Sequence, residues 1–438
     1  MCGIIVSTEI IQDGVDIFLK KRGPDCTNKI TYNNIHFAHY LLHLTGEKTL
    51  QPLIENNKVC IFNGEIYNYK EIFKDAKSDV YSIMKAYELY GDDFIKYLDG
   101  EFAIVFFDFD NNKLIISGDI FKTKPLFYHV SNDNITISSY KSACFKIKQQ
   151  KYNSINANET LIFDLNTYEI IKKDRIYDFD LNQYKTSYDD YINAFEKSVL
   201  KRIPETSIPL VTLSSGLDSG AIACCLNKYN KKSLYMTINK NEDDNVIQER
   251  KKILGDHYIL NLTNDEKHNW GNYLKKNCEP CFWDWRYHPR LKKIDDAFKM
   301  GSMLGKSKIL TETKKIDNNI KVLLSGIGAD EIMAHHSFYA YGCGNVDVFP
   351  DNLKDVFPWK NFYEGTMDNY IRGDEYVGGC FSFETRYPFC DKDVVQEFLW
   401  LKPELKNIYN NSNYKPSLLY YLDKHKFPYC KRKLGFNV

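Results

Sequence analysis

The sequence predicts two domains of different class: a first domain built mainly from β-strands, and a second α/β domain with a parallel sheet. Its 438 residues exceed the usual size of a single domain. Up to about residue 171 the apolar runs are short and rich in β-branched and aromatic residues, and Asn, Asp and Gly separate them. After residue 188 strand patterns alternate with helical ones, which is typical of a parallel sheet covered by helices.

The first half contains several strand patterns and one helix. The helix is predicted from Ser78 to Leu89, with Asp79 in its first turn. A further β-rich stretch from Glu159 to Ile171 ends this region. The clearest predicted strands are Val59–Phe62, Phe102–Phe107, Lys113–Ser117 and Ile135–Ser138.

A polar segment, Asp178–Ser187, separates the two halves and is the candidate linker. We therefore predict domains at residues 2–177 and 188–438. The elements predicted for the start of the second domain are a helix over Tyr188–Lys201, a strand over Ile208–Leu213, a helix after Asp218 and a strand over Leu234–Ile238.

The composition is that of an ordinary soluble protein, with 43% hydrophobic and 26% charged residues. Lys+Arg and Asp+Glu are both 58, so the zero net charge gives no reason to expect a nucleic-acid or membrane partner. No apolar run approaches about 20 residues and no signal peptide precedes Cys2, so we expect a cytoplasmic protein. The twelve cysteines form no short regular framework, which fits reduced thiols.

Cys2 suggests nucleophilic catalysis at the amino terminus. If the initiator methionine is removed, this residue carries both a thiol and a free α-amine. An α-amine has an unperturbed pKa of ~7.7–8.0, so it can accept the thiol proton near neutral pH without a separate histidine. Acyl transfer is then the first reaction to consider. A chance cysteine after methionine is the alternative for this residue taken alone.

A second chemical motif lies where the strand ending at Leu213 meets the next helix. Small and hydroxyl-bearing residues run from Ser214 to Gly220, ahead of an apolar helix over Ala221–Leu226. Such a loop lets the backbone approach a phosphate, and the helix N-terminus favours negative charge. Asp218 can hold Mg²⁺ against the phosphates. An ordinary serine-capped turn is the structural alternative, and no Gly-Lys-Ser/Thr follows as in a Walker loop.

Two groups of motifs, in a fixed order along the chain, carry a resemblance. The first group is Cys2–Ile4, Arg22–Asp25, Gln51–Leu53, Asn63–Asn68, Ser78–Asp79, Leu98–Ala103 and Lys124–Tyr128. The second group is Leu213–Ser219, Leu324–Glu331 and Phe383–Asp391. Together they resemble the glutamine-hydrolysing asparagine synthetase family over nearly the whole chain. The resemblance implies a class II glutamine amidotransferase domain, an α+β N-terminal-nucleophile hydrolase sandwich, followed by an α/β parallel-sheet ATP-pyrophosphatase domain.

The resemblance implies a division of labour between two sites. In the first, Cys2 attacks the side-chain amide of glutamine, and Asn63 and Gly64 stabilise the oxyanion as ammonia leaves. Glu65 and Asp79 match the residues that hold the glutamine α-ammonium. In the second, ATP activates a carboxylate as its acyl-adenylate, which ammonia arriving through an internal passage converts to an amide.

For the second site the resemblance implies a set of ATP-binding and magnesium-binding residues. Asp218 and Asp330 match the metal-side carboxylates, and Thr237 matches a position near adenine. Lys415 matches a catalytic lysine that neutralises charge on the phosphates, although a solvated lysine in a lysine-rich tail is an equal alternative. The positions carried over as ATP-binding are Leu213, Ser214, Ser215, Gly216, Asp218, Ser219, Thr237, Ser325 and Gly326.

Three departures from the family's motifs bear on the substrates. Leu41 stands where the family has an arginine that binds the α-carboxylate of glutamine, a contact commonly worth ~2–5 kcal/mol. Ile327 stands where asparagine synthetases have a glutamate near the acceptor, and Ser215 replaces a glycine of the pyrophosphate loop. The aromatic run from Phe282 to His288 is unlike the lining of a small aspartate pocket, although core packing explains aromatic residues more often.

The leading prediction is a ligase of asparagine biosynthesis that uses glutamine, ATP and Mg²⁺, with aspartate as the default carboxylate acceptor. One alternative is an amide- or lactam-forming relative that acts on a nucleobase, sugar acid or peptide acid. Another is a scaffold in which both sites are dead, although such a protein has no chemical reason to keep Cys2, Asn63, Asp79, Asp218 and Asp330 together. The expected partners are small molecules, with a homodimer as the candidate assembly.

Overall fold

The computed structural model describes residues 2–131, 134–286, 293–335, 338, 348–407 and 415–431, and the chain divides into two compact units. The first unit comprises Met1–Asp178 together with Asn277–Pro280 and Gly378–Glu384, and the second comprises Phe179–Lys276, Cys281–Val377 and Thr385–Val438. The two short segments in the first unit come from far along the chain and were not predicted. Three residues named above, Tyr287, His288 and residue 438 at the end of the second predicted domain, lie outside the described residues.

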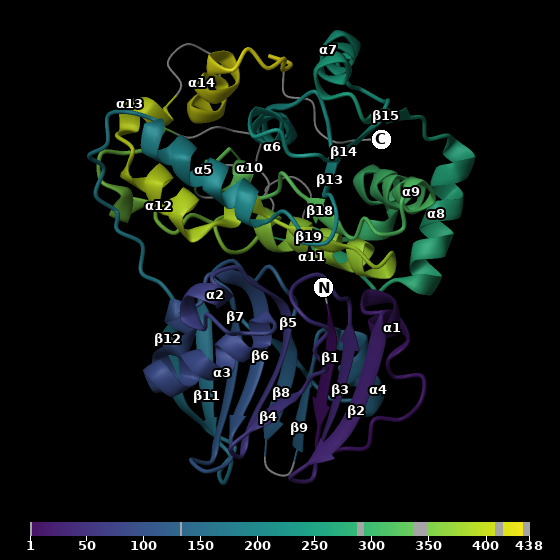
Figure 1. Ribbon diagram of the computed structural model, residues 1–438, viewed down its shortest axis with the longest axis vertical. Coiled ribbons are helices and arrows are strands. Elements are labelled where there is room, and N and C mark those ends of the chain that lie inside the picture. The colour runs from purple at the N-terminus through teal and green to yellow at the C-terminus, as the bar shows by residue number, and fades with distance from the viewer. Residues whose placement is uncertain are drawn as a thin grey trace. The chain divides into compact units, whose positions relative to one another are not determined.

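Two six-stranded sheets form the first unit (Figure 1), and neighbouring strands within each sheet are antiparallel. The first sheet has the order β10 (Asn153–Ser154), β8 (Phe127–Ser131), β9 (Asn134–Ser138), β1 (Gly3–Ser7), β3 (Ile35–Leu41) and β2 (Cys26–Tyr32). The second has the order β12 (Ile170–Arg175), β11 (Glu159–Asp164), β7 (Lys113–Gly118), β6 (Gly100–Asp108), β5 (Lys58–Ile66) and β4 (Leu53–Glu55).

A shared hydrophobic core holds the two sheets face to face. Ile4 and Val6 of β1 belong to the same buried cluster as Ile61 of β5 and Val105 of β6. The other face of the second sheet packs against helices α2 (Tyr69–Ile72) and α3 (Asp79–Tyr90). Helices α1 (Ile17–Arg22) and α4 (Lys141–Ile147) contact strands of the first sheet. This arrangement confirms the predicted sandwich of antiparallel sheets between helices.

The second unit confirms the predicted α/β class. Its sheet has the order β15 (His257–Leu260), β14 (Leu234–Ile238), β13 (Leu210–Thr212), β18 (Val322–Leu324) and β19 (Glu384–Arg386). The pairings of β13 with β14, β13 with β18 and β14 with β15 are parallel. The helices used below are α5 (Asp189–Lys201), α6 (Leu217–Lys228), α11 (Thr366–Cys380), α12 (Lys392–Trp400) and α14 (Pro416–Lys424).

The segment predicted as a linker is packed against the second unit along most of its length. The backbone nitrogen of Asp180 donates to Gln396 Oε1 of α12 over 2.9 Å, and Lys185 donates to Glu397 Oε2. Phe179 makes edge contacts with the rings of Phe357 and Phe362. Its polar composition therefore reflects hydrogen bonding to a neighbouring helix and not a freely solvated connection.

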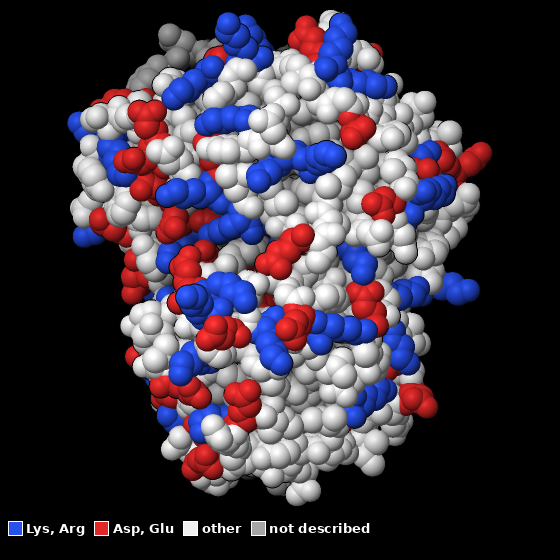
Figure 2. Space-filling view, in the orientation of Figure 1, with Lys and Arg blue, Asp and Glu red and all other residues white. Residues whose placement is uncertain are grey.

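Charged side chains of both signs are interspersed over the visible face of the molecule (Figure 2). This matches the equal totals of basic and acidic residues in the sequence. Among the helices that the structure describes, none combines the length and the apolar character needed to cross a lipid bilayer.

The buried carboxylate of Asp391 holds together the end of α5 and the start of α12. It accepts from Arg202 over 2.8 Å, contacts Lys201 Nζ at 2.6 Å and caps α12 by accepting from the backbone nitrogen of Asp393. Burial would raise the pKa of Asp391, but the charges of Lys201 and Arg202 outweigh it and lower the pKa.

We expect Asp391→Asn to lower the free energy of unfolding by about 3–5 kcal/mol, because it removes the buried carboxylate that contacts both the Arg202 guanidinium and the Lys201 ammonium. Urea denaturation at pH 7 measures this change. Asp178→Asn, on a highly exposed side chain, serves as the matched control. An Asp391→Asn midpoint equal to that of the parent chain would contradict the assignment.

Candidate functional site

Cys2 is held in place at both ends of its backbone. Its nitrogen lies 2.8 Å from Asn63 Oδ1, and its carbonyl oxygen accepts from Arg22 Nε over 2.8 Å. The Arg22 guanidinium is itself buried, and it donates to the Tyr140 hydroxyl. Because both backbone groups are fixed, the direction of the Cys2 Cα–Cβ bond is fixed as well.

Asn63 faces Cys2 with its oxygen and leaves its amide nitrogen available. The Cys2 nitrogen is a donor, so the Asn63 atom that faces it has to be the carbonyl oxygen. Asn63 Nδ2 is buried and has no hydrogen-bond partner among the described residues. A buried amide without a partner is costly, and near a nucleophile it is a ready donor to a developing oxyanion.

Gly64 lies next to Asn63 on β5 and approaches the neighbouring strand very closely. A Cβ at this residue would lie 2.0 Å from the Glu101 carbonyl oxygen, and its φ of +138° also favours glycine. The N–H groups of Phe62 and Ile66 donate to the side chains of Gln51 and Asp79. Strand alternation directs the Gly64 N–H to that same edge of β5, beside the pocket that Gly64 lines.

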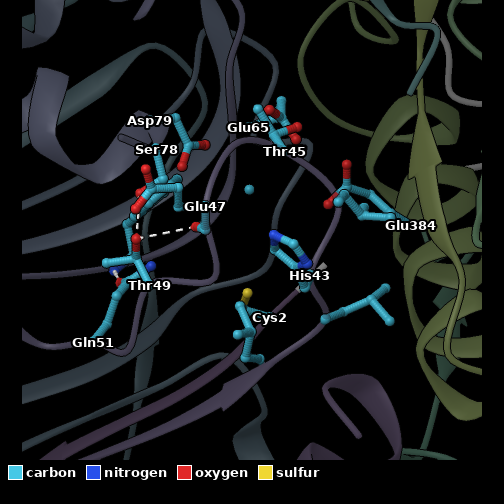
Figure 3. A pocket seen from close by; sticks show the side chains of 15 residues that line it. Cys2, His43, Thr45, Glu47, Thr49, Gln51, Glu65, Ser78, Asp79 and Glu384 are labelled. Atoms are coloured by element: carbon cyan, nitrogen blue, oxygen red, sulfur yellow. Dashed lines mark hydrogen bonds between the residues drawn. The ribbon is translucent and has the colours of Figure 1, made fainter. Parts of the chain in front are cut away.

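A pocket in the first unit opens at the Cys2 thiol (Figure 3). Its empty volume is about 400 Å³, including the open mouth. Figure 3 shows the Cys2 side chain directed into the pocket, with Glu65 and Asp79 across from it. The lining residues are Cys2, Leu41, Leu42, His43, Leu44, Thr45, Glu47, Thr49, Gln51, Phe62, Gly64, Glu65, Ser78, Asp79 and Glu384.

Three buried carboxyl groups, those of Glu65, Asp79 and Glu384, line this pocket. Burial raises the pKa of Asp79 well above its usual range, and the charges of Glu65 and Glu384 raise it further. Burial also raises the pKa of the Cys2 thiol to about 11, and Glu384 and Asp79 add to the shift. The thiol is therefore protonated at neutral pH and needs a base before it can act as a nucleophile.

The predicted phosphate loop has well-defined hydrogen bonds in the second unit. The Ser214 nitrogen donates to Ser219 Oγ over 3.0 Å, and the Gly216 nitrogen donates to Ser214 Oγ over 3.1 Å. Strand β13 ends at Thr212 and α6 begins at Leu217, so the loop lies at a helix N-terminus as predicted. The Ser215 nitrogen and hydroxyl both donate to Glu242 Oε2, at 2.6 and 2.5 Å.

Lys415 bridges the two carboxylates that we predicted on the metal side. It is buried, it bonds to Asp218 Oδ1, and its Nζ lies 2.6 Å from Asp330 Oδ1. Burial would lower the pKa of Lys415, but the charges of Asp218 and Asp330 outweigh it and raise the pKa. The ammonium is therefore charged, and the structure places it inside the second site and not in a solvated tail.

Close packing also brings Ser325, Gly326 and Thr237 to this region. A Cβ at Gly326, which follows β18, would lie only 3.0 Å from Asp218 Cβ, so a side chain there would crowd the first turn of α6. Ser325 Oγ donates to Asp374 Oδ2 over 2.9 Å. Thr237 Oγ1 donates to the Leu213 carbonyl over 2.5 Å, which ties the ends of β13 and β14 together.

Three residues of these sites were not predicted. Glu384 reaches the Cys2 pocket from the segment Gly378–Glu384, and no local pattern indicates this placement. Glu242 follows the carboxyl end of β14, and ligands of parallel sheets bind at the carboxyl ends of the strands. Its position after a predicted strand could therefore have identified it as a candidate site residue. Arg250 donates to the carbonyls of Ser214 and Gly216 and to the Pro428 carbonyl, so it anchors the phosphate loop.

In the described part of the aromatic run, the two tryptophans belong to the core and Phe282 is exposed. Trp283 and Trp285 are buried, and both rings contact Tyr370 of α11, at centroid distances of 5.3 and 6.3 Å. Burial, and after it the charges of Glu331 and Asp330, raise the pKa of Tyr370. This aromatic cluster therefore lies within electrostatic range of the second site.

No group of three or more His, Cys, Asp or Glu side chains in the described part of the chain is arranged to hold a metal ion. The eleven described cysteines are all free thiols.

Comparison with known proteins gives one family match and several full-length relatives. Residues 1–181 match the glutamine amidotransferase domain. The putative asparagine synthetase [glutamine-hydrolyzing] 1 of Methanocaldococcus jannaschii is 26% identical over 413 residues, covering 85% of this chain and 70% of that protein. Asparagine synthetase [glutamine-hydrolyzing] 2 of Arabidopsis thaliana is 24% identical over 422 residues, covering 89% and 68%.

Among solved structures, the glutamine phosphoribosylpyrophosphate amidotransferase of B. subtilis aligns at 14% identity with a TM-score of 0.32, over 76% of this chain and 77% of that one. The antiparallel sandwich and the parallel sheet described above establish the fold without this likeness. Residues 1–181 thus match the glutamine amidotransferase domain, and most of the chain is similar in sequence to glutamine-hydrolysing asparagine synthetases.

Proposed function

We propose that this protein is a glutamine-dependent, ATP-consuming ligase that forms an amide at a carboxylate. The observation that carries the proposal is the pairing of Cys2 with Asn63, in which a fixed thiol lies beside a buried amide donor. The match of residues 1–181 to the glutamine amidotransferase domain supports the first half of the reaction. The asparagine synthetase relatives support the second half.

In the first half-reaction, Met1 is removed and the α-amine of Cys2 takes the thiol proton. The sulfur then attacks the amide carbon of glutamine, and Asn63 Nδ2 and the Gly64 N–H donate to the oxyanion. The amide nitrogen leaves as ammonia, and water hydrolyses the thioester to glutamate. Glu65 and Asp79 bind the α-ammonium, since their field favours a cation.

In the second half-reaction, a carboxylate attacks the α-phosphate of ATP and pyrophosphate leaves. Lys415 stabilises the negative charge that builds on the phosphates, because its ammonium is buried and stays charged. The N–H and hydroxyl donors of Ser214, Ser215 and Ser219 bind phosphate oxygens. When ATP binds, Ser215 releases its two hydrogen bonds to Glu242 and donates to the phosphate instead. Ammonia then displaces AMP from the acyl-adenylate.

The carboxylates of Asp218 and Asp330 fit Mg²⁺, which prefers one or two carboxylate oxygens together with phosphate oxygens and water. When bound, Mg²⁺ neutralises phosphate charge. Lys415 contacts one oxygen of each of these carboxylates and so holds the two side chains near one another.

Aspartate is the default acceptor, from the names of the relatives. One observation favours a different carboxylate. Ile327 lies between Ser325 and Asp330 and presents an apolar, half-buried side chain, and Tyr370 is within electrostatic range of Asp330. An acceptor with an apolar or flat part would suit these neighbours better than aspartate does.

Substitution of Asn63 tests the first half-reaction. We expect Asn63→Ala to lower kcat for ammonia release from L-glutamine by about 10²–10³-fold, because one oxyanion donor is lost, and Cys2→Ala to abolish release. Asn57→Ala, whose amide bonds to the exposed Asp110, is the matched control and keeps the parent rate. An Asn63→Ala variant with the parent kcat would contradict the proposed role.

Substitution of Lys415 tests the second half-reaction. With ammonium salts as the nitrogen source and a panel of carboxylic acids that begins with aspartate, we expect Lys415→Gln to lower pyrophosphate release from ATP by about 10²–10³-fold. Lys424→Gln removes a half-exposed charge from the same helix and serves as the control. Equal loss in both variants would show that Lys415 has no special role.

A further inference from the structure

The phosphate loop, residues 214–219, binds the carboxylate of Glu242. Glu242 Oε2 accepts from the Ser215 backbone nitrogen over 2.6 Å and from Ser215 Oγ over 2.5 Å. One carboxylate oxygen thus takes two donors of a loop whose expected ligand is a phosphate. Carboxylate and phosphate compete for such donors, because both present negatively charged oxygen acceptors. We call these two donors of Ser215 the anion seat.

The carbonyl oxygens of the same loop are bound by donors from elsewhere in the second unit. Arg250 donates to the carbonyls of Ser214 and Gly216, and the Cys430 nitrogen donates to the Ser215 carbonyl over 2.8 Å. Each of these oxygens is directed at its donor, so three consecutive groups that would repel a phosphate are kept occupied. The anion seat therefore offers donors to an incoming anion.

Arg250 also adds a buried positive charge next to the loop. Its side chain is fully buried, and in the described part of the chain its hydrogen bonds go to backbone carbonyls and to no carboxylate. Burial lowers the pKa of Arg250 to about 10, and the charge of Glu242 opposes this shift, so the guanidinium stays charged at neutral pH. A buried cation of this kind favours an anion in the seat.

Gly220 of α6 makes room for the Arg250 guanidinium. A Cβ at this residue would lie 2.3 Å from Arg250 Nη2 and 3.2 Å from Nη1. Glycine lowers the stability of a helix relative to alanine, so its place in the second turn of α6 is explained by this close approach. The glycine and the arginine together support the loop from the side of its carbonyl groups.

We propose that Glu242 is an internal competitor of ATP, whose carboxylate occupies the seat to which the pyrophosphate portion of ATP binds. The inference rests on the proposed ATP-binding function of the second site. Glu242 is half-buried and lies between β14 and α7 (Asp244–Leu254), next to the exposed Asn241, so its side chain can turn into solvent without disturbing the core. Because ATP has to displace this carboxylate, Glu242 lowers the affinity for ATP and sets the concentration at which the ligase works.

The same contacts have a structural interpretation, in which Glu242 only ties the loop to the segment after β14. The Asp243 nitrogen donates to Ser215 Oγ over 3.1 Å and supplies such a tie without Glu242. The two interpretations predict opposite effects of removing the Glu242 charge. Loss of a competitor strengthens ATP binding, whereas loss of a structural tie weakens it.

Isothermal titration calorimetry of the intact chain with ATP and Mg²⁺, and separately with AMP, distinguishes the two interpretations. We expect Glu242→Gln to lower the Kd for ATP by at least about tenfold, because a neutral amide binds the seat's donors less strongly than a carboxylate. The Kd for AMP, which lacks the pyrophosphate portion, should not change. Glu249→Gln removes an exposed carboxylate from α7 and is the matched control, with the Kd values of the parent chain.

Two further variants test the seat itself. Arg250→Lys keeps the charge but cannot bond three carbonyls, and Gly220→Ala places a methyl group against the guanidinium. We expect each to raise the Kd for ATP by at least about tenfold, because the loop carbonyls lose their donors. Gly271→Ala, on α8 (Asn264–Asn277), is the control, since a Cβ there meets no atom closer than 3.4 Å.

The outcomes separate this inference from the proposed function. An unchanged or higher Kd for ATP in Glu242→Gln, or an equal gain for ATP and AMP, would show that Glu242 does not compete for the seat, while ATP binding by the second site stands. Parent affinity for ATP in both Arg250→Lys and Gly220→Ala would place the phosphate elsewhere and overturn the inference as well. If neither the folded wild-type chain nor Glu242→Gln binds ATP, the proposed function of the second site fails too.

Discussion

The hydrogen bond between the Cys2 nitrogen and Asn63 Oδ1 is the interaction on which the first site depends. It joins β1 of one sheet to β5 of the other, so it exists only because the hydrophobic core brings the two sheets face to face. By using the oxygen of Asn63, it leaves the amide nitrogen as the only part of that side chain able to meet a reacting carbonyl. One bond thus fixes the nucleophile and selects the oxyanion donor at the same time.

The two sites are built from opposite arrangements of charge. Around Cys2 the buried acidic groups are carboxyls, and burial, followed by the charges of Glu65 and Glu384, raises the pKa of Asp79. In the second unit, a buried lysine lies between Asp218 and Asp330, so the carboxylates there are balanced by a cation that can face phosphate. The first field suits an ammonium group on an amide substrate, and the second suits a polyphosphate. The charge of each site alone therefore favours a different kind of ligand, independently of individual contacts.

Sequence patterns predicted those helices and strands that are marked by an apolar run or a helical period within their own residues. The strand Leu234–Ile238 and the helix Asp79–Tyr90 were found within one residue, because an apolar run or a helical period marks each of them. Strand β1 was missed because all five of its residues are buried and show no alternation. Glu384 could not be placed near Cys2 from sequence, since tertiary packing alone brings its segment to the first unit. The motifs located Cys2, Asn63 and Lys415, while the unpartnered amide and the ion pairs required coordinates.

The most direct measurement of the central claim is mass spectrometry of acid-quenched protein during turnover of L-glutamine. A thiol that attacks the side-chain amide passes through a thioester, and acid preserves that bond. The account predicts an acyl adduct on the peptide that begins with Cys2, and no adduct on the peptide that contains the half-buried Cys26. Turnover without any adduct on Cys2, or an adduct on another cysteine, would contradict the assignment of Cys2 as the nucleophile.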